Sequence, residues 1–278
     1  MAASSGITLT SGMRKNLFSL QNTQALLERT QRRLATGQRV NTPIDDPINY
    51  FTSLVHRQRA EDLASRKDEM SESIQLVMAA NEGVEGIIAL LASAKSLAQS
   101  AMSAGSEAEV TALQAQYNEV LTQIDQMAND SGYKGTNLLL GEDVTHTVTF
   151  NGDGSSFLVM TGFDGTADGL LLVEADDWVG TDGPDKGAIL DHIVLLDNAR
   201  TALRTEAQKL STNLSTITIR QDFTKGMINT LEDGAAELTN ADMNEEGANM
   251  LMLQTRQSLG TTSLALASQA AQSILRLF

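Results

Sequence analysis

The chain has 278 residues, of which 41% are apolar and 4% are aromatic, with a single Trp. A composition poor in aromatic residues but rich in Ala, Leu and Gln is typical of long helices packed side by side. The net charge of −15 argues against nucleic acid as a partner, because phosphate binding needs a basic surface. The lack of Cys excludes disulfides, thiol chemistry and Cys-based metal sites.

The charge is unevenly distributed. Residues 142–191 hold eleven Asp and Glu and one basic residue, Lys186. Residues 1–40 are basic, with cations at Arg14, Lys15, Arg29, Arg32, Arg33 and Arg39. The pattern indicates that the acidic segment 142–191 is exposed to solvent. For the basic cluster two interpretations stay open, a solvated face or an interface that meets acids on neighbours.

In the first predicted helix the apolar residues are spaced alternately four and three residues apart, or seven apart, as in a coiled coil. They are Met13, Leu17, Leu20, Leu27 and Leu34. The helix ends at Gly37, and Pro43 and Pro47 then forbid a continuous helix. Asp46 is placed to cap the next helix.

That second helix is predicted over residues 47–104, where apolar residues recur every seven positions. Ser106 then caps a third helix, with Glu109 three residues on as a capping box. The third helix ends within residues 129–135.

The only strong strand signal follows. Residues 144–150 and 157–160 flank the turn sequence 151–154, which predicts a β-hairpin. Residues 161–187 are rich in Gly and acidic residues, which predicts a loop with a further short hairpin.

A fourth helix is predicted from Asp185, and a final helix from Asp242 to Phe278. The two breaks lie at similar distances from the two termini, so the terminal helices can pair antiparallel. We therefore predict a mainly α fold: a long antiparallel helical bundle or coiled coil with a small β-hairpin tip, the termini paired as a two-helix coiled coil.

Three domains follow from the breaks: 1–45 plus 240–278, 46–141 plus 186–239, and the tip 142–185. Three long central helices can bury one another's apolar faces. Two terminal helices alone leave one apolar side exposed to solvent, which favours self-association. We expect the ends to be disordered in the monomer and to fold on polymerising. The predicted self-assembly residues are Met13, Leu17, Leu20, Leu27, Leu34, Met250, Leu264, Ala271, Ile274 and Phe278.

Three segments resemble bacterial flagellins. Residues 34–47 are similar to that family's N-terminal signature, and 123–139 to the segment before its hairpin. Residues 265–278 are similar to its C-terminal sequence. The signature residues carried here are Gly37, Arg39, Asn41, Asp45 and Asp46.

The resemblance implies a subunit of the flagellar filament, a homopolymer that is secreted through the flagellar type III apparatus and is extracellular. It implies an inner tube of terminal helices, an outer shell of central helices, and contacts with a cap, hook-junction proteins and an export chaperone. A hook–filament junction protein is the nearest alternative, and a secreted helical effector is a third hypothesis.

The same resemblance bears on immune recognition. In flagellins sensed by the flagellin-binding Toll-like receptor, an Arg and a Leu on one helix and a Glu on the next are equivalent to Ala92, Leu97 and Gln116 here. The Leu is retained, but the Arg and the Glu are replaced. Because an Arg anchor is not easily substituted, the resemblance implies weak receptor activation.

No catalytic pattern is present in the sequence. There is no HExxH, GxSxG or complete phosphate loop, and 151–162 lacks the Gly and Glu of a calcium loop. We therefore expect no enzyme activity, cofactor or metal. The longest apolar run, 87–92, is far too short to predict a membrane span.

Overall fold

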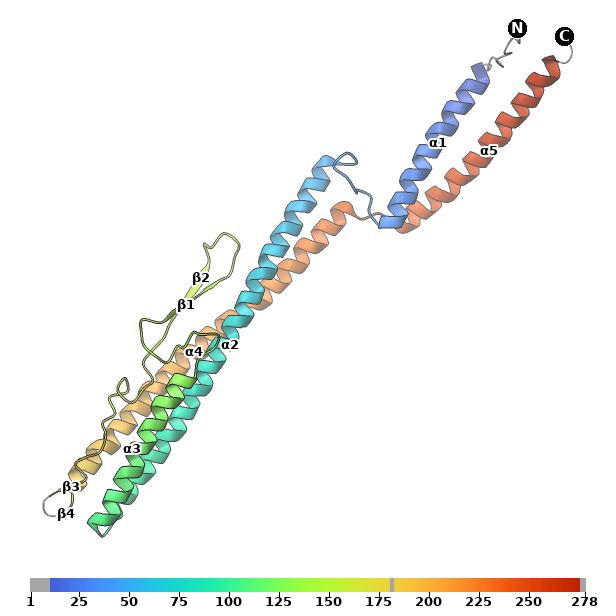
Figure 1. Ribbon diagram of the computed structural model, residues 1–278. Coiled ribbons are helices and arrows are strands. Elements are labelled where there is room, and N and C mark those ends of the chain that lie inside the picture. The colour runs from blue at the N-terminus through green and yellow to red at the C-terminus, as the bar shows by residue number, and fades with distance from the viewer. Residues whose placement is uncertain (1–10, 181–182, 276–278) are drawn as a thin grey trace, which may run out of the picture. The chain divides into compact units, whose positions relative to one another are not determined.

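The computed structural model describes residues 11–180 and 183–275, which form five long helices and two short hairpins (Figure 1). The predicted fold class, mainly helical with a small hairpin and paired terminal helices, is confirmed. The chain divides into unit 1, Met1–Gln58 with Thr230–Phe278, and unit 2, Arg59–Asn229. This division falls inside two continuous helices, whereas the predicted domain boundaries lie at the breaks between helices.

Unit 1 contains α1 (Ser11–Thr36) and α5 (Met243–Leu275). It also contains the first turns of α2 (Pro47–Ser103) and the last turns of α4 (Lys186–Thr239). α1 ends because Gly37 takes a φ of 71°, a left-handed conformation that costs glycine little. α5 begins where the Asp242 carboxylate accepts the Asn244 amide at 2.8 Å.

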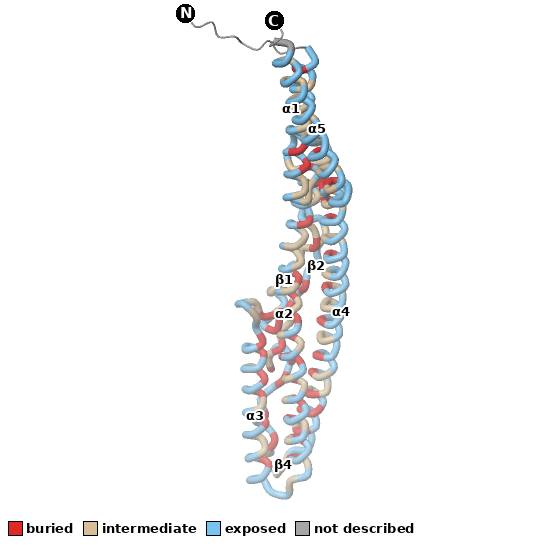
Figure 2. Tube along the Cα trace, turned by 90° about the vertical axis from the view of Figure 1, so that its right-hand side faces the viewer, coloured by how far each residue is buried: buried red, intermediate tan, exposed pale blue. Residues whose placement is uncertain are grey.

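Unit 2 packs α2, α3 (Glu107–Asp130) and α4 around one apolar core. Fully buried residues come from all three helices, such as Val84 of α2, Ile124 of α3 and Leu203 of α4. Figure 2 shows buried residues along the sides of these helices that face one another. This burial accounts for the apolar character of α2, which by length and composition alone would also suit a membrane-spanning helix.

The predicted helix start at Ser106 is confirmed. The Ser106 hydroxyl accepts the Glu109 amide at 3.3 Å, which satisfies one of the free N–H groups of the first turn of α3. Beyond α3, Lys134 and Gly135 both have positive φ, 49° and 84°, and form a tight turn closed by Tyr133 and Thr136.

Both predicted hairpins form. β1 (Thr145–Thr149) pairs antiparallel with β2 (Phe157–Thr161), and β3 (Val179–Gly180) pairs with β4 (Gly183–Pro184).

The larger hairpin does not lie at a tip, which corrects the predicted placement. It lies along the helices of unit 2, where His146 Nε2 is 2.9 Å from Ser73 Oγ of α2. The Arg220 guanidinium of α4 lies 5.2 Å from the Phe150 ring centroid. One side of the hairpin is apolar, and it is removed from solvent only where it packs against the core of unit 2. Val148 and other residues of that side belong to this core.

Candidate assembly surface

α1 and α5 pair antiparallel, which we call the terminal helix pair. Position 260 of α5 is a glycine, and a Cβ there would lie 2.6 Å from Leu20 Cδ2, so the two helices approach closely. Polar contacts at three levels fix the register. They join Asn16 to Ser263 at 3.2 Å, Gln24 to Gln257 at 2.9 Å, and Arg33 to Glu246 at 2.6 Å.

The residues predicted for self-assembly lie mainly in the seam between these two helices of the same chain. Met13 and Leu27 are buried there, with Leu253 of α5. Leu17 is 39% exposed. The half-buried members are Leu20, Leu34, Met250, Leu264 and Ala271. Phe278 and the side chain of Ile274 lie outside the described residues.

A second set of apolar residues faces away from the seam, and the sequence prediction missed it. Phe18 is 65% exposed, Leu251 68%, Leu259 66% and Leu266 61%. We call these four residues, of which Phe18 lies on α1 and the other three lie on α5, the outward strip. Leu259 and Leu266 lie seven positions apart, so a heptad line in α5 beside the one through Leu264 and Ala271 is the signal that could have revealed them.

The signature residues lie together at the junction where α1 leads to α2 and α4 leads to α5. The Arg39 amide donates to the Thr239 carbonyl at 2.7 Å, and the Ala241 amide donates to the Gly37 carbonyl at 2.9 Å. Arg39 Nη2 also donates to the Leu238 carbonyl at 3.4 Å. These backbone bonds tie the two linkers of unit 1 to each other.

The two signature acids shape the linker before α2. Asp45 Oδ2 accepts the amides of Asn41 and Thr42 and the Thr42 hydroxyl, at 3.2, 3.0 and 3.0 Å. Burial alone would raise the pKa of Asp45, but these hydrogen bonds outweigh it and lower that pKa. Asp46 caps α2 by accepting the Asn49 amide at 3.1 Å. Both acids therefore have structural roles.

The start of α2 is also apolar and open. Ile48 is 77% exposed, Phe51 54% and Val55 59%, and their spacing of three and four residues places them on one helix face. Ile44, in the linker before them, is 93% exposed. Exposed apolar residues that follow one helix face in this way indicate an interaction surface.

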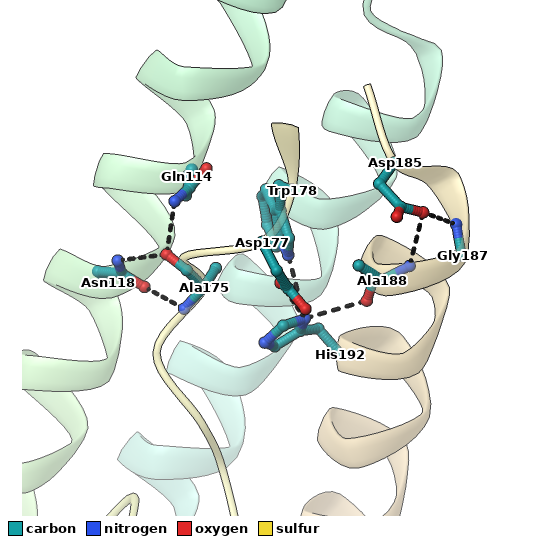
Figure 3. Close-up of polar contacts among 9 residues, drawn as sticks. All are labelled: Gln114, Asn118, Ala175, Asp177, Trp178, Asp185, Gly187, Ala188 and His192. Atoms are coloured by element: carbon teal, nitrogen blue, oxygen red, sulfur yellow. Dashed lines mark hydrogen bonds and ion pairs between the residues drawn. The ribbon is translucent and has the colours of Figure 1, made fainter. Parts of the chain in front are cut away.

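Unit 2 holds its long loop by polar contacts to α3 (Figure 3). Asn118 Nδ2 donates to the Ala175 carbonyl at 2.9 Å, and Asn118 Oδ1 accepts the Ala175 amide at 2.8 Å. Gln114 Nε2 donates to the same carbonyl at 2.7 Å. Asp185 caps α4 by accepting the Gly187 amide at 2.9 Å. These contacts hold the loop in place beside the single Trp.

The aromatic cluster beside this loop is a packed core. Trp178 is fully buried, its ring centroid lies 4.9 Å from that of Tyr117, and its Nε1 donates to His192 Nδ1 at 3.1 Å. The same His192 nitrogen lies 3.0 Å from the Ala188 carbonyl oxygen. Burial raises the pKa of Tyr117 to about 12. A phenol held neutral and a histidine held by a tryptophan are suited to packing.

The receptor-site equivalents lie on α2 and α3. Ala92 and Gln116 are exposed, and Leu97 is half-buried. The nearby cation Lys95 is engaged within the chain, because its Nζ donates to both carboxylate oxygens of Asp197 at 2.7 and 2.8 Å.

The described part of the chain holds no group of three or more His, Asp or Glu able to bind a metal ion. A groove of about 680 Å³ lies between β2 and α4, lined by residues such as Val159, Phe163 and Lys209. Its polar groups do not form a nucleophile–base pair. The exposed apolar helix faces of unit 1 are surfaces of the kind that other proteins cover, and they are typical of a subunit that packs against other proteins.

The comparisons agree with that class. The family model of the bacterial flagellin N-terminal helical region matches residues 9–144, and that of the C-terminal helical region matches residues 193–278. The chain therefore belongs to the bacterial flagellin family. It is a structural subunit that polymerises into the extracellular flagellar filament, the structure by which bacteria swim.

Relatives agree over nearly the whole length. Flagellin FljN of Caulobacter vibrioides is 26% identical over 99% of each chain. A flagellin of Brucella melitensis is 27% identical over 94% of this chain and 95% of its own. A crystal structure of Bacillus cereus flagellin has a TM-score of 0.47 at 13% identity, over 56% of this chain and 88% of that one.

Proposed function

We propose that unit 1 makes the inner contacts of the filament and that unit 2 forms its outer shell. The observation that carries this proposal is the outward strip, because four large apolar residues more than 60% exposed are covered when copies pack side by side. Burying one such side chain contributes about 1.5–3 kcal/mol. The exposed face of Ile48, Phe51 and Val55 in the same unit extends the surface available to neighbours.

The seam residues have a different role in this proposal. Met13, Leu27 and Leu253 are buried within the chain, so they order the terminal helix pair and thereby present the outward strip. The predicted self-assembly residues thus act on assembly through the fold of the pair. The signature residues at the junction fix how the two linkers of unit 1 are joined.

Membership of the family supports the remaining roles that we propose. The subunit is secreted through the flagellar type III apparatus, with an export chaperone, and is incorporated between the hook-junction proteins and the filament cap. It acts without catalysis, cofactor or metal.

Seeded polymerisation tests the proposal. Wild-type protein should extend filament seeds into long filaments, and Phe18→Asp or Leu259→Asp should prevent extension, because each places a charge in an apolar contact. Phe157→Asp is the matched control, since Phe157 is similarly exposed, 57%, but lies in unit 2. Short stubs from wild-type protein would instead identify a junction protein, and normal filaments from both variants would contradict the assigned surface.

A further inference from the structure

The two units differ sharply in charge. Residues 1–58 hold seven Lys and Arg and three Asp and Glu, a net charge of +4. Residues 230–278 hold two Lys and Arg and six Asp and Glu, which gives a net charge of −4. Unit 1, which consists of these two segments, is therefore neutral, and unit 2 carries the whole charge of −15. Unit 1 is thus built from two segments of opposite charge.

The positive segment presents a basic face on α1. Arg29 and Arg32 are exposed and lie three residues apart, so they are neighbours on the helix surface. At 3.6 residues per turn, Arg14 lies on the same side of the helix, and so does Phe18 of the outward strip. The buried Leu27 points the other way, toward α5. The basic face of α1 therefore points away from α5 of the same chain.

The negative segment presents an acidic face on the last turns of α4. Asp233 and Glu237 are exposed and lie four residues apart, while Leu231 and Ala235 between and beside them are buried. Both faces lie within about two helical turns of the junction. The hydrogen bonds of that junction hold the two linkers together, so the two charged faces are parts of one unit.

Neither face is neutralised within the chain. In the part of the chain that the structure describes, Arg29, Arg32, Asp233 and Glu237 make no ion pair and no side-chain hydrogen bond. Arg32 is close enough to Asp45 to lower the pKa of that carboxyl, but the two groups are not paired. In contrast, Arg33 on the inner side pairs with Glu246 at 2.6 Å.

We propose that the basic face of α1 binds the acidic face of α4 of a second copy of this chain. The two faces are different patches of the same unit, so when each copy uses one face toward one neighbour and the other face toward the next, the contact is heterologous and extends into an open polymer. It also offsets the repulsion between neighbouring copies of unit 2, each of which carries −15. The inference rests on the filament function proposed above and adds the recognition element that sets the register between copies.

Charge reversal tests it. The variant R29E/R32E makes the basic face acidic, and D233R/E237R makes the acidic face basic. Each variant alone should raise the critical concentration for seeded elongation on the order of tenfold at low ionic strength, because attraction becomes repulsion, and less at high salt. An equimolar mixture should elongate like wild type, because each reversed face then meets its complement on the other variant.

The control is K186E/K225E, which changes the net charge by the same amount as R29E/R32E but lies in unit 2. It should elongate like wild type. Trp178 fluorescence and circular dichroism should be unchanged in the unit 1 variants, since the single Trp lies in the core of unit 2.

Two results would overturn the inference while wild-type filaments still form: normal elongation of both unit 1 variants alone, or a mixture no better than its components. A control as impaired as R29E/R32E would also overturn it, since the effect would then be one of net charge. Wild-type protein that never elongates would overturn the filament function and this contact with it.

Discussion

Replacing Leu27 by Asp separates the two roles assigned to the apolar residues of unit 1. Leu27 is 6% exposed and Leu253, at the same level of the antiparallel pair, is 5% exposed. The substitution removes about 2 kcal/mol of apolar burial and places a carboxylate against Leu253, for a total cost of roughly 3 kcal/mol. At 1.4 kcal/mol per factor of ten, the pairing constant of α1 with α5 falls on the order of a hundredfold.

Limited proteolysis of the dilute monomer measures this opening, because cleavage of an open segment follows the population of the open form. The terminal helix pair is formed in the structure, so we expect proteolysis to trim the ends of wild-type protein to a core of roughly residues 45–240 through transient opening of the pair. The ends of Leu27→Asp, in which the pair is open more often, should be cleaved much faster. Leu259→Asp, at an exposed position of the same pair, should be cleaved like wild type although we expect it to form no filaments. Equal cleavage rates for the two variants would refute an intrachain seam at Leu27.

Three further predictions concern unit 2. Asn118→Ala removes both bonds to Ala175 and should lower the free energy of unfolding by about 2 kcal/mol, measured by urea denaturation, whereas Asn129→Ala, which loses one exposed bond within its own helix, should have little effect. Burial lowers the pKa of His146, so the unfolded chain binds the proton more readily than the folded chain. The free energy of unfolding should therefore fall as the pH drops below about 6.5, the ordinary pKa of histidine. His146→Gln should flatten this part of the stability–pH curve, and an unchanged curve would exclude His146 as its cause. In a reporter-cell assay the monomer should activate the flagellin-binding Toll-like receptor weakly and the Ala92→Arg, Gln116→Glu double variant more strongly, whereas potency equal to that of a strong enterobacterial flagellin would contradict the prediction.

Local chemistry allows most of the fold to be predicted from the sequence. Gly37 and Pro47 mark the end of one helix and the start of the next, since only glycine adopts the observed φ easily and proline suits a first turn. Ser106 starts α3 because its hydroxyl replaces a missing backbone partner. Such signals act over a few residues and need no knowledge of distant contacts.

Features that depend on distant contacts were predicted less well. The strands of the hairpin follow from their alternation, but its position depends on Ser73 and Arg220, which lie far from it in sequence. Likewise, the heptad line through Leu27 predicts an apolar seam but does not say whether the partner helix belongs to the same chain. The structure answers that question with α5, and it leaves the outward strip exposed.

Chemical labelling of the outward strip tests the central claim most directly. The natural chain has no Cys, so Leu259→Cys provides a single thiol at a position that is 66% exposed in the monomer. Ser155→Cys, in the exposed turn of the hairpin in unit 2, provides the control. If copies pack through unit 1, a maleimide should label both monomers rapidly, but in filaments only the Ser155→Cys variant should react. Equal labelling of the Leu259→Cys variant in monomer and filament would contradict the account.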